Sequence, residues 1–192
     1  VLVHGGGRTA TDLAAQLGIE TRMVEGRRIT DADTLRVVTM VYAGLVNKNV
    51  TAQLQAAGIN ALGLCGADMD VIRSHRRAPR GGIDYGYVGD VDRVDGARLA
   101  ALVRSGITPV MAPLTHDGEG HLLNTNADTI AGETAKALAP HIDVPLVHTF
   151  EHAGVRTDAS REDSGIPLIT TALSVRMRRE GVGGRGRGHK TG

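Results

Sequence analysis

Short apolar runs alternate with longer stretches of helical periodicity along most of the chain. Apolar runs at residues 61–64, 108–112 and 144–150 predict strands, and the periodicity of residues 95–104 and 126–139 predicts helices. This alternation is typical of an α/β domain whose strands form a largely parallel sheet. The pattern therefore predicts the α/β class, without an internal sequence repeat.

A long helical pattern occupies residues 30–58. Its apolar positions recur at helical spacing and are Leu35, Val38, Tyr42 and Leu45. Thr30 is expected to cap the start of this helix, with Asp33 three residues later. Gly58 is expected to end it.

Residues 84–95 depart from this organisation. Apolar and polar residues alternate there around glycine, which predicts a hairpin rather than another crossover unit. Such a hairpin could act as a flap over a site.

Two loops at expected strand ends carry candidate chemistry, because sites in open α/β sheets lie at the carboxyl ends of strands. The first is the glycine triplet Gly5–Gly7, which follows the apolar residues 1–3 and His4. Backbone N–H groups in such a turn can approach an anion without obstruction by a Cβ atom. A flexible turn explains the triplet equally well. The dinucleotide fingerprint GxGxxG and the phosphate loop GxxxxGK[ST] are both absent, which disfavours a dinucleotide oxidoreductase.

The second loop spans residues 122–128. Asn124 and Asn126 alternate, so both amides face the same way on an extended backbone. Asp128 falls in the first turn of the following helix, where the helix dipole favours a carboxylate. A purely structural interpretation, with Asn126 as the helix cap and Asp128 as a first-turn acid, remains open.

Composition narrows the classes of function. The 192 residues are 41% hydrophobic, which suits one core of ordinary size, and 22 basic residues balance 21 acidic ones to a net charge of +1. Aromatic residues make up only 2%, so base stacking is poorly supported and nucleic acid is an unlikely partner. No apolar run reaches the about 18 to 20 residues that a membrane helix needs. The single cysteine, Cys65, is expected to be a small buried residue, and this cysteine usage favours the cytoplasm and no multi-thiolate metal site.

The last twenty residues differ from the rest. We expect a domain over residues 1–172 and a basic, glycine-rich tail over residues 173–192, which holds six basic residues, one acid and six glycines. The tail fits an RNA-binding arm of the Arg/Gly type, a terminus without a fold, or a break in the natural reading frame.

Seven sequence blocks in order resemble the acetylglutamate kinase family. They are HGGG (4–7), GRRIT (26–30), AGLVNKN (43–49), ALGLCGAD (61–68), VGDV (88–91), PVMAPLTHD (109–117) and LNTNADTIAG (123–132). The resemblance covers residues 1–169. Residues 149–155 are most similar to the variant typical of Bacteroidetes-like bacteria.

The resemblance implies the amino-acid kinase fold, a three-layer αβα sandwich with an open, mainly parallel sheet, present here incompletely. It implies transfer of the γ-phosphoryl group of ATP, with Mg²⁺, to the side-chain carboxylate of an N-acyl-L-glutamate such as N-acetyl-L-glutamate. It also implies a homodimer, or a higher homo-oligomer, formed through the helix of residues 30–58.

The same resemblance assigns roles to individual residues. Gly6 and Gly7 would contact the substrate, Arg28 would hold its α-carboxylate, Asn124 would bind it, and Asp128 would organise two catalytic lysines. Further candidates are His4, Gly5 and Asn126, of which His4 could contact phosphate or be structural.

The chain also departs from the family pattern. The family has a first lysine upstream of HGGG, where this chain has already begun, and a second near the basic tail, where only Lys190 stands. We therefore expect a truncated or frame-shifted sequence, inactive as it stands. Two alternatives remain open, an N-succinylglutamate kinase and a non-catalytic RNA-binding protein that uses the tail.

Overall fold

The computed structural model describes residues 1–24 and 26–149, so the basic tail with Lys190 and residues 150–172 lie outside the described residues. The strands are β1 Leu2–Val3, β2 Met23–Val24, β3 Arg27–Arg28, β4 Ala61–Leu64, β5 Ile72–Arg76, β6 Gly89–Val94, β7 Thr108–Met111, β8 Leu114–His116 and β9 Leu122–Asn124. The helices are α1 Gly7–Gln16, α2 Ala32–Thr39, the π-helix η1 Met40–Val46, α3 Asn47–Ala56, the 3₁₀-helix η2 Asp68–Asp70, α4 Gly96–Arg104 and α5 Ala127–Leu138.

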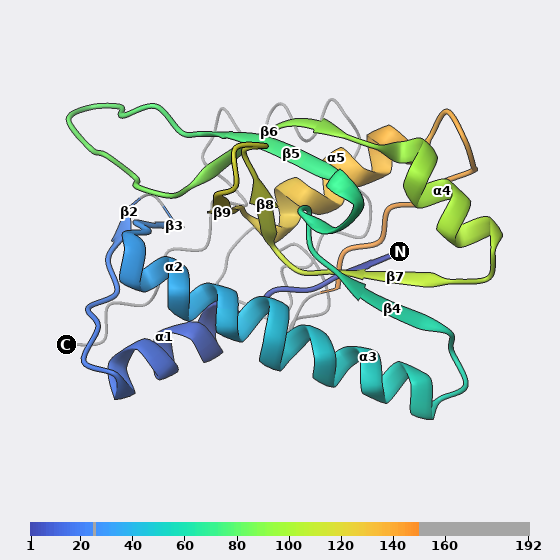
Figure 1. The fold of residues 1–192 in the computed structure, drawn as a ribbon, viewed down its shortest axis with the longest axis horizontal. Coiled ribbons are helices and arrows are strands. Elements are labelled where there is room, and N and C mark those ends of the chain that lie inside the picture. Colours follow the sequence, from blue (N-terminus) through green and yellow to red (C-terminus); the bar gives the residue numbers. More distant parts are fainter. Residues whose placement is uncertain (25, 150–192) are drawn as a thin grey trace, which may run out of the picture. The chain divides into compact units, whose positions relative to one another are not determined.

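The described strands form a three-stranded parallel sheet, a four-stranded mixed sheet and a two-stranded antiparallel pair (Figure 1). β7 lies between β1 and β4 and runs parallel to both. A second sheet has the order β6-β5-β8-β9, in which β5 and β8 are parallel and the outer pairs are antiparallel. β2 and β3 form a separate antiparallel pair. The α/β class is confirmed, and antiparallel pairing enters at β2–β3, β5–β6 and β8–β9.

Two apolar clusters lie on opposite faces of the strands and define three layers. One cluster joins α1, α2 and η1 to residues after β4 and β7, including Ala10, Val38 and Ala112. The other joins α4 and α5 to the strands through Leu99, Ile130 and residues such as Met111. Met111 and Ala112 contribute to different clusters because successive side chains of an extended segment point to opposite faces. Helices therefore cover both sides of the strands, as the three-layer fold requires.

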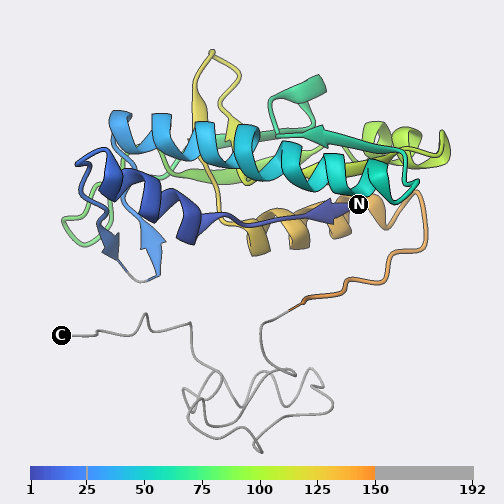
Figure 2. The same ribbon diagram turned by 90° about the horizontal axis from the view of Figure 1, so that it is seen from below.

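The helix expected over residues 30–58 is present as one continuous rod of α2, η1 and α3 (Figure 2). Its cap is Asp31 and not Thr30: the carboxylate of Asp31 accepts the Thr34 N–H at 2.8 Å. The hydroxyl of Thr30 instead donates to the backbone oxygen of Arg28, so it is unavailable to the helix. Gly58 follows the helix with φ of 78°, a left-handed conformation that glycine adopts easily.

The hairpin expected within residues 84–95 is confirmed as an antiparallel pairing without a crossover, but its bounds are wrong, because only its second strand lies in that range. Residues 89–94 form the single strand β6, whose antiparallel partner is β5, Ile72–Arg76. Residues 77–88 connect the two strands, and their Thr30–Gly86 and Val88–Asn124 bridges are parallel. The alternation that predicted a hairpin is the ordinary two-residue period of one strand with a solvent-facing side.

The remaining predicted elements can be checked within the described residues. The strands at 61–64 and 108–112 and the helices at 95–104 and 126–139 are confirmed to within about one residue at each end. The prediction of a strand at 144–150 is wrong over its described part, because residues 144–149 form no strand. Val144 packs against the core, but Pro145 lacks an N–H group and Val147 is 76% exposed, so the run does not continue into the core as a strand would. No helix in the described ranges is long and apolar enough to span a bilayer.

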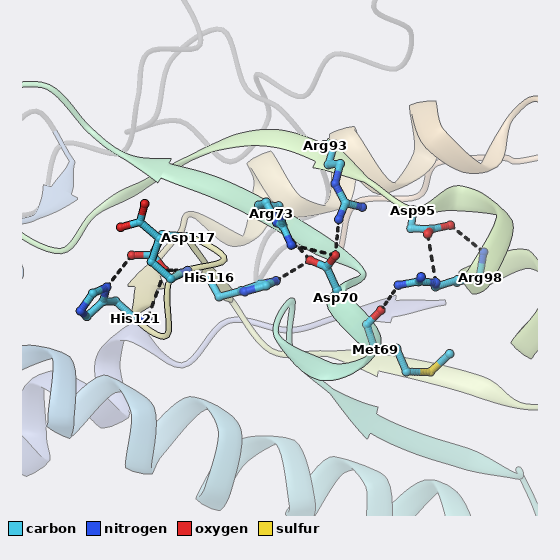
Figure 3. Close-up of polar contacts among 10 residues, drawn as sticks. Met69, Asp70, Arg73, Arg93, Asp95, Arg98, His116, Asp117 and His121 are labelled. Atoms are coloured by element: carbon cyan, nitrogen blue, oxygen red, sulfur yellow. Dashed lines mark hydrogen bonds and ion pairs between the residues drawn. The ribbon is translucent and has the colours of Figure 1, made fainter.

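An ion-pair cluster stabilises a strained turn before β5 (Figure 3). Met69 and Asp70 have φ of 55° and 53°, which is unfavourable for residues other than glycine. The Asp70 carboxylate accepts hydrogen bonds from three side chains, those of Arg73, Arg93 and His116. The backbone oxygen of Met69 accepts one from Arg98. These contacts hold the turn in a conformation that its backbone alone disfavours.

Candidate substrate site

A cavity of about 230 Å³ lies where the glycine loop, the β2–β3 pair, η1 and the start of α5 meet. Its walls come from segments distant in sequence, and the lining residues are Gly5, Gly6, Gly7, Met23, Gly26, Arg27, Arg28, Tyr42, Val88, Pro113, Asn124, Thr125, Asn126 and Ala127. The cavity therefore brings together six of the eight residues predicted as site residues. His4 and Asp128 are not among its walls.

Two helix N-termini face this cavity. Gly6 caps α1, Asn126 caps α5, and the first residue of each helix also lines the cavity. Unpaired N–H groups and the helix dipole make a helix N-terminus attractive to anions. α1 has no acidic residue in its first turn that would oppose this potential. The arrangement suits a phosphoryl group or a carboxylate.

Gly6 is required by its surroundings. Its φ is 157°, and a Cβ atom there would lie 2.8 Å from a ring carbon of Tyr42. The buried Tyr42 ring therefore packs directly against the glycine loop. Any larger residue at position 6 would push this wall of the cavity aside.

Arg28 is a buried cation at the cavity wall, with only 8% of its surface exposed. Its guanidinium donates to the Gly7 oxygen at 2.9 Å, to Thr11 Oγ1 at 2.9 Å and to Thr21 Oγ1 at 3.1 Å. All three acceptors are neutral, and within residues 1–24 and 26–149 no carboxylate is paired with Arg28. A buried charge without a counter-ion is costly, so a carboxylate ligand in the cavity would be strongly favoured there.

The start of α5 agrees with the structural interpretation of its polar residues. Asn126 accepts the Thr129 N–H at 3.0 Å and is the N-cap of α5. Asp128 lies exposed in the first turn of the helix. Its place in the first helical turn is compatible with a second role, so the catalytic assignment of Asp128 stays a prediction.

His4 is a buried residue with a structural position. Its Nε2 lies 3.1 Å from the Asn47 side-chain nitrogen, and its Nδ1 lies 2.6 Å from the Gly5 oxygen. Because the Asn47 nitrogen can only donate, Nε2 is the acceptor and Nδ1 carries the proton. Burial lowers the pKa of His4, against the opposing hydrogen bond to Gly5. Both ring nitrogens are engaged, which favours the structural alternative over phosphate contact.

Two residues at the site were not found from the sequence. Tyr42 was recognised only as an apolar helix position, yet it forms part of the cavity wall. Burial raises the pKa of its hydroxyl, and the nearby positive charge of Arg28 opposes that shift. The pattern predicts Thr30 as a helix cap, yet its spacing of two from Arg28 places both side chains on the same side of an extended segment.

The described lysines do not reach the cavity. Lys48 donates to the Gly63 oxygen at 3.1 Å, and Lys136 pairs with Glu133 at 2.7 Å. Cys65 is buried, and its pKa is raised by that burial, as expected for a structural thiol.

A separate cluster of possible metal ligands lies in the turn between β8 and β9. It comprises Asp117, Glu119 and His121 (the first and last labelled in Figure 3). The Asp117 carboxylate already accepts the backbone N–H groups of Glu119 and His121, and its pKa is lowered to about 2 by these and the His121 side chain, against desolvation. These residues do not line the cavity.

Comparison with known proteins defines the class. The sequence matches the amino acid kinase family over residues 1–171, and the chain belongs to that family. A dinucleotide oxidoreductase is thereby excluded.

The most informative relatives are acetylglutamate kinases. The chain is 69% identical over 170 residues to the acetylglutamate kinase of Phocaeicola vulgatus, covering 88% of the chain and 66% of that protein. It is 65% identical over 182 residues to the acetylglutamate kinase of Bacteroides thetaiotaomicron, and the match covers 95% of this chain and 70% of that protein. The resemblance to acetylglutamate kinases, in their Bacteroidetes-like variant, is confirmed. The chain spans about two thirds of the length of these relatives.

Solved structures agree on the fold. smu.665 from Streptococcus mutans superposes with a TM-score of 0.79 at 27% identity, over 94% of this chain and 69% of that one. The chain also superposes on an N-acetylglutamate synthase from Neisseria gonorrhoeae, solved with coenzyme A and N-acetyl-glutamate, with a TM-score of 0.71 at 22% identity. The superposition covers 94% of this chain and 39% of that one. At this identity the second likeness concerns the fold alone.

Proposed function

We propose that the protein containing this chain transfers the γ-phosphoryl group of ATP to the γ-carboxylate of N-acetyl-L-glutamate in arginine biosynthesis. The observation that carries the proposal is Arg28, a buried guanidinium without a described carboxylate partner, at a cavity that two helix N-termini also face. The similarity to acetylglutamate kinases supports the same conclusion.

The substrate would be bound through its polar ends. Arg28 would hold the α-carboxylate with charge-assisted hydrogen bonds, for which a planar fork is well suited. Asn124, which also lines the cavity, would bind the neighbouring amide. The γ-carboxylate would then point toward the glycine loop.

The phosphoryl group would be received by backbone N–H groups of Gly6 and Gly7 at the start of α1. An oxygen of the γ-carboxylate forms a bond to the γ-phosphorus while the bond to the β–γ bridging oxygen breaks, and ADP leaves with that electron pair. Bound Mg²⁺ would neutralise phosphate charge, mainly through phosphate oxygens and water. Asp128 would orient lysines outside the described residues, because a carboxylate can hold two ammonium groups in position.

The exposed face of the long helix suits a homodimer. Met40 and Leu45 are large apolar side chains that remain exposed on η1, and their burial against a second copy would remove apolar surface from water. With one cysteine in the sequence, the cytoplasm is the compartment we propose.

The test traps the product. The complete protein is incubated with ATP, Mg²⁺, N-acetyl-L-glutamate and hydroxylamine, which converts an acyl phosphate into a hydroxamate. We expect hydroxamate with N-acetyl-L-glutamate and none with unacylated L-glutamate. Product only with N-succinyl-L-glutamate would reassign the acyl group of the substrate. No product with N-acetyl-L-glutamate or with N-succinyl-L-glutamate would contradict the proposal.

A further inference from the structure

Thr30 connects two segments that line the cavity, although it does not line the cavity itself. It is fully buried, with 0% of its surface exposed. Its hydroxyl donates to the backbone oxygen of Arg28 at 3.0 Å and contacts Asn124 Nδ2 at 3.0 Å. One hydroxyl thus bridges the segment that carries the buried cation and the loop that carries the amide.

The chemistry of this hydroxyl determines how the amide is oriented. A threonine hydroxyl has one hydrogen, and here that hydrogen is donated to the backbone oxygen of Arg28. Toward Asn124 the oxygen can therefore only accept, so the NH₂ group of Asn124 must face Thr30. The amide oxygen points away from Thr30, and among the described residues it accepts no hydrogen bond from a side chain or backbone.

Backbone contacts hold this arrangement in place. Thr30 N–H donates to the Tyr85 oxygen at 3.0 Å, and Tyr87 N–H donates to the Thr30 oxygen at 2.6 Å. Asn124 N–H in turn donates to the Tyr87 oxygen at 2.8 Å. At Gly86 a Cβ atom would lie 2.2 Å from the Thr30 backbone oxygen, so only glycine at this position lets the two main-chain segments approach so closely. The spacing between Thr30 and Asn124 is therefore set by the main chain.

We propose that Thr30 is a positioning residue that makes Asn124 a hydrogen-bond acceptor in the cavity. Arg28 supplies donors for a carboxylate, and Asn124 supplies an acceptor in the same cavity. This pattern is complementary to a carboxylate whose α-carbon bears an N–H group, which is the recognition element of an N-acylated α-amino acid. The inference rests on the proposed function and adds the basis for selecting a ligand with an amide N–H.

The experiment compares two ligands that differ at this group. Isothermal titration of the chain measures the Kd of N-acetyl-L-glutamate and of (S)-2-acetoxyglutarate, in which an ester oxygen replaces the N–H. We expect the wild-type chain to prefer the amide by about tenfold or more, because the ester leaves the Asn124 oxygen facing another acceptor. Thr30→Val removes the hydroxyl at nearly constant shape, and it should reduce the preference to about threefold or less, mainly by weakening amide binding.

Two further variants separate positioning from general damage. Thr30→Ser retains the hydroxyl and should keep the wild-type preference. Thr134→Val is a matched control, because Thr134 is a buried threonine of α5 whose hydroxyl has no hydrogen-bond partner in the described part of the chain. It should change neither Kd.

Each outcome decides the question. Equal binding of both ligands by the wild-type chain, or an unchanged preference in Thr30→Val, overturns the role of Thr30 while the proposed function stands. Binding of neither ligand by the wild-type chain overturns the proposed function and this inference together. Should Thr30→Val fail to fold, Thr30→Ala removes the same hydroxyl without adding a methyl group to the site, and the same criteria apply.

Discussion

Replacement of Arg28 by alanine tests the substrate site most directly. The side chain is 8% exposed and lies at the cavity wall, and its three hydrogen bonds within the protein go to neutral acceptors. In the ligand-free chain, the lost hydrogen bonds are offset by removal of a buried charge that lacks a described counter-ion. We therefore expect Arg28→Ala to alter the free energy of unfolding by only about 1 kcal/mol.

Binding should change far more. Charge-assisted hydrogen bonds contribute about 1.5–3 kcal/mol, which corresponds to a rise of about 10- to 150-fold in the Kd of N-acetyl-L-glutamate. Arg28→Lys keeps the charge and loses the planar fork, so its Kd should lie between those of the wild type and Arg28→Ala. ATP binding should be nearly unchanged, because the phosphates are expected at the glycine loop.

The assay is isothermal titration of each ligand, with the thermal midpoint recorded for every variant. Arg36→Ala is the matched control: its side chain is 78% exposed, and it forms only an ion pair with Asp33 at 3.2 Å. This control should leave both Kd values within about twofold, because exposed ion pairs contribute little. An Arg28→Ala variant that binds N-acetyl-L-glutamate as the wild type does, or that loses ATP affinity equally, would refute the carboxylate assignment.

Three further predictions concern other parts of the domain. In the complete enzyme, Asp128→Asn should lower kcat by orders of magnitude with little change in Tm if the carboxylate orients lysines; a decrease of less than about tenfold would leave only its role in the first helical turn. Gly63→Ala should lower the free energy of unfolding by about 1–3 kcal/mol in chemical denaturation, because a Cβ atom there would lie 2.1 Å from Asn47 Oδ1. Gly44→Ala is the control: a Cβ atom at position 44 would have no neighbour within 4 Å, so this change should be neutral or stabilising. Burial lowers the pKa of His4 below 6.5, so the unfolded chain takes up this proton first and stability should fall as the pH drops below about 6.5. His4→Gln should show a smaller loss between pH 7 and pH 5 in urea unfolding, and an unchanged pH slope would contradict the assignment.

Much of the local structure was readable from the sequence. Helix ends follow from residues that act on their immediate neighbours, such as Asn126 at the start of α5 and Gly58 after the long helix. The strands at 61–64 and 108–111 are short apolar runs between such signals. The start of α2 is not fixed to the residue by its sequence, because Thr30 and Asp31 are adjacent and both can cap a helix.

Strand pairing and side-chain neighbours were decided only by the tertiary structure. The alternation of residues 89–94 indicates a strand but does not identify β5 as its partner, since pairing depends on segments elsewhere in the chain. Residues 144–149 are apolar enough for a strand, yet an isolated run cannot form one without a neighbour to bond its main chain.

The candidate site shows the same division. The glycine triplet and the two asparagines were identifiable as residues able to bind an anion or an amide, and family resemblance added Arg28. The wall formed by Tyr42 and the bridge from Thr30 to Asn124, 94 residues apart, could not be inferred. Hydrogen-bonding capacity belongs to each residue and can be read from its identity. The partner that uses this capacity is set by which segments the folded chain brings within about 3 Å of one another.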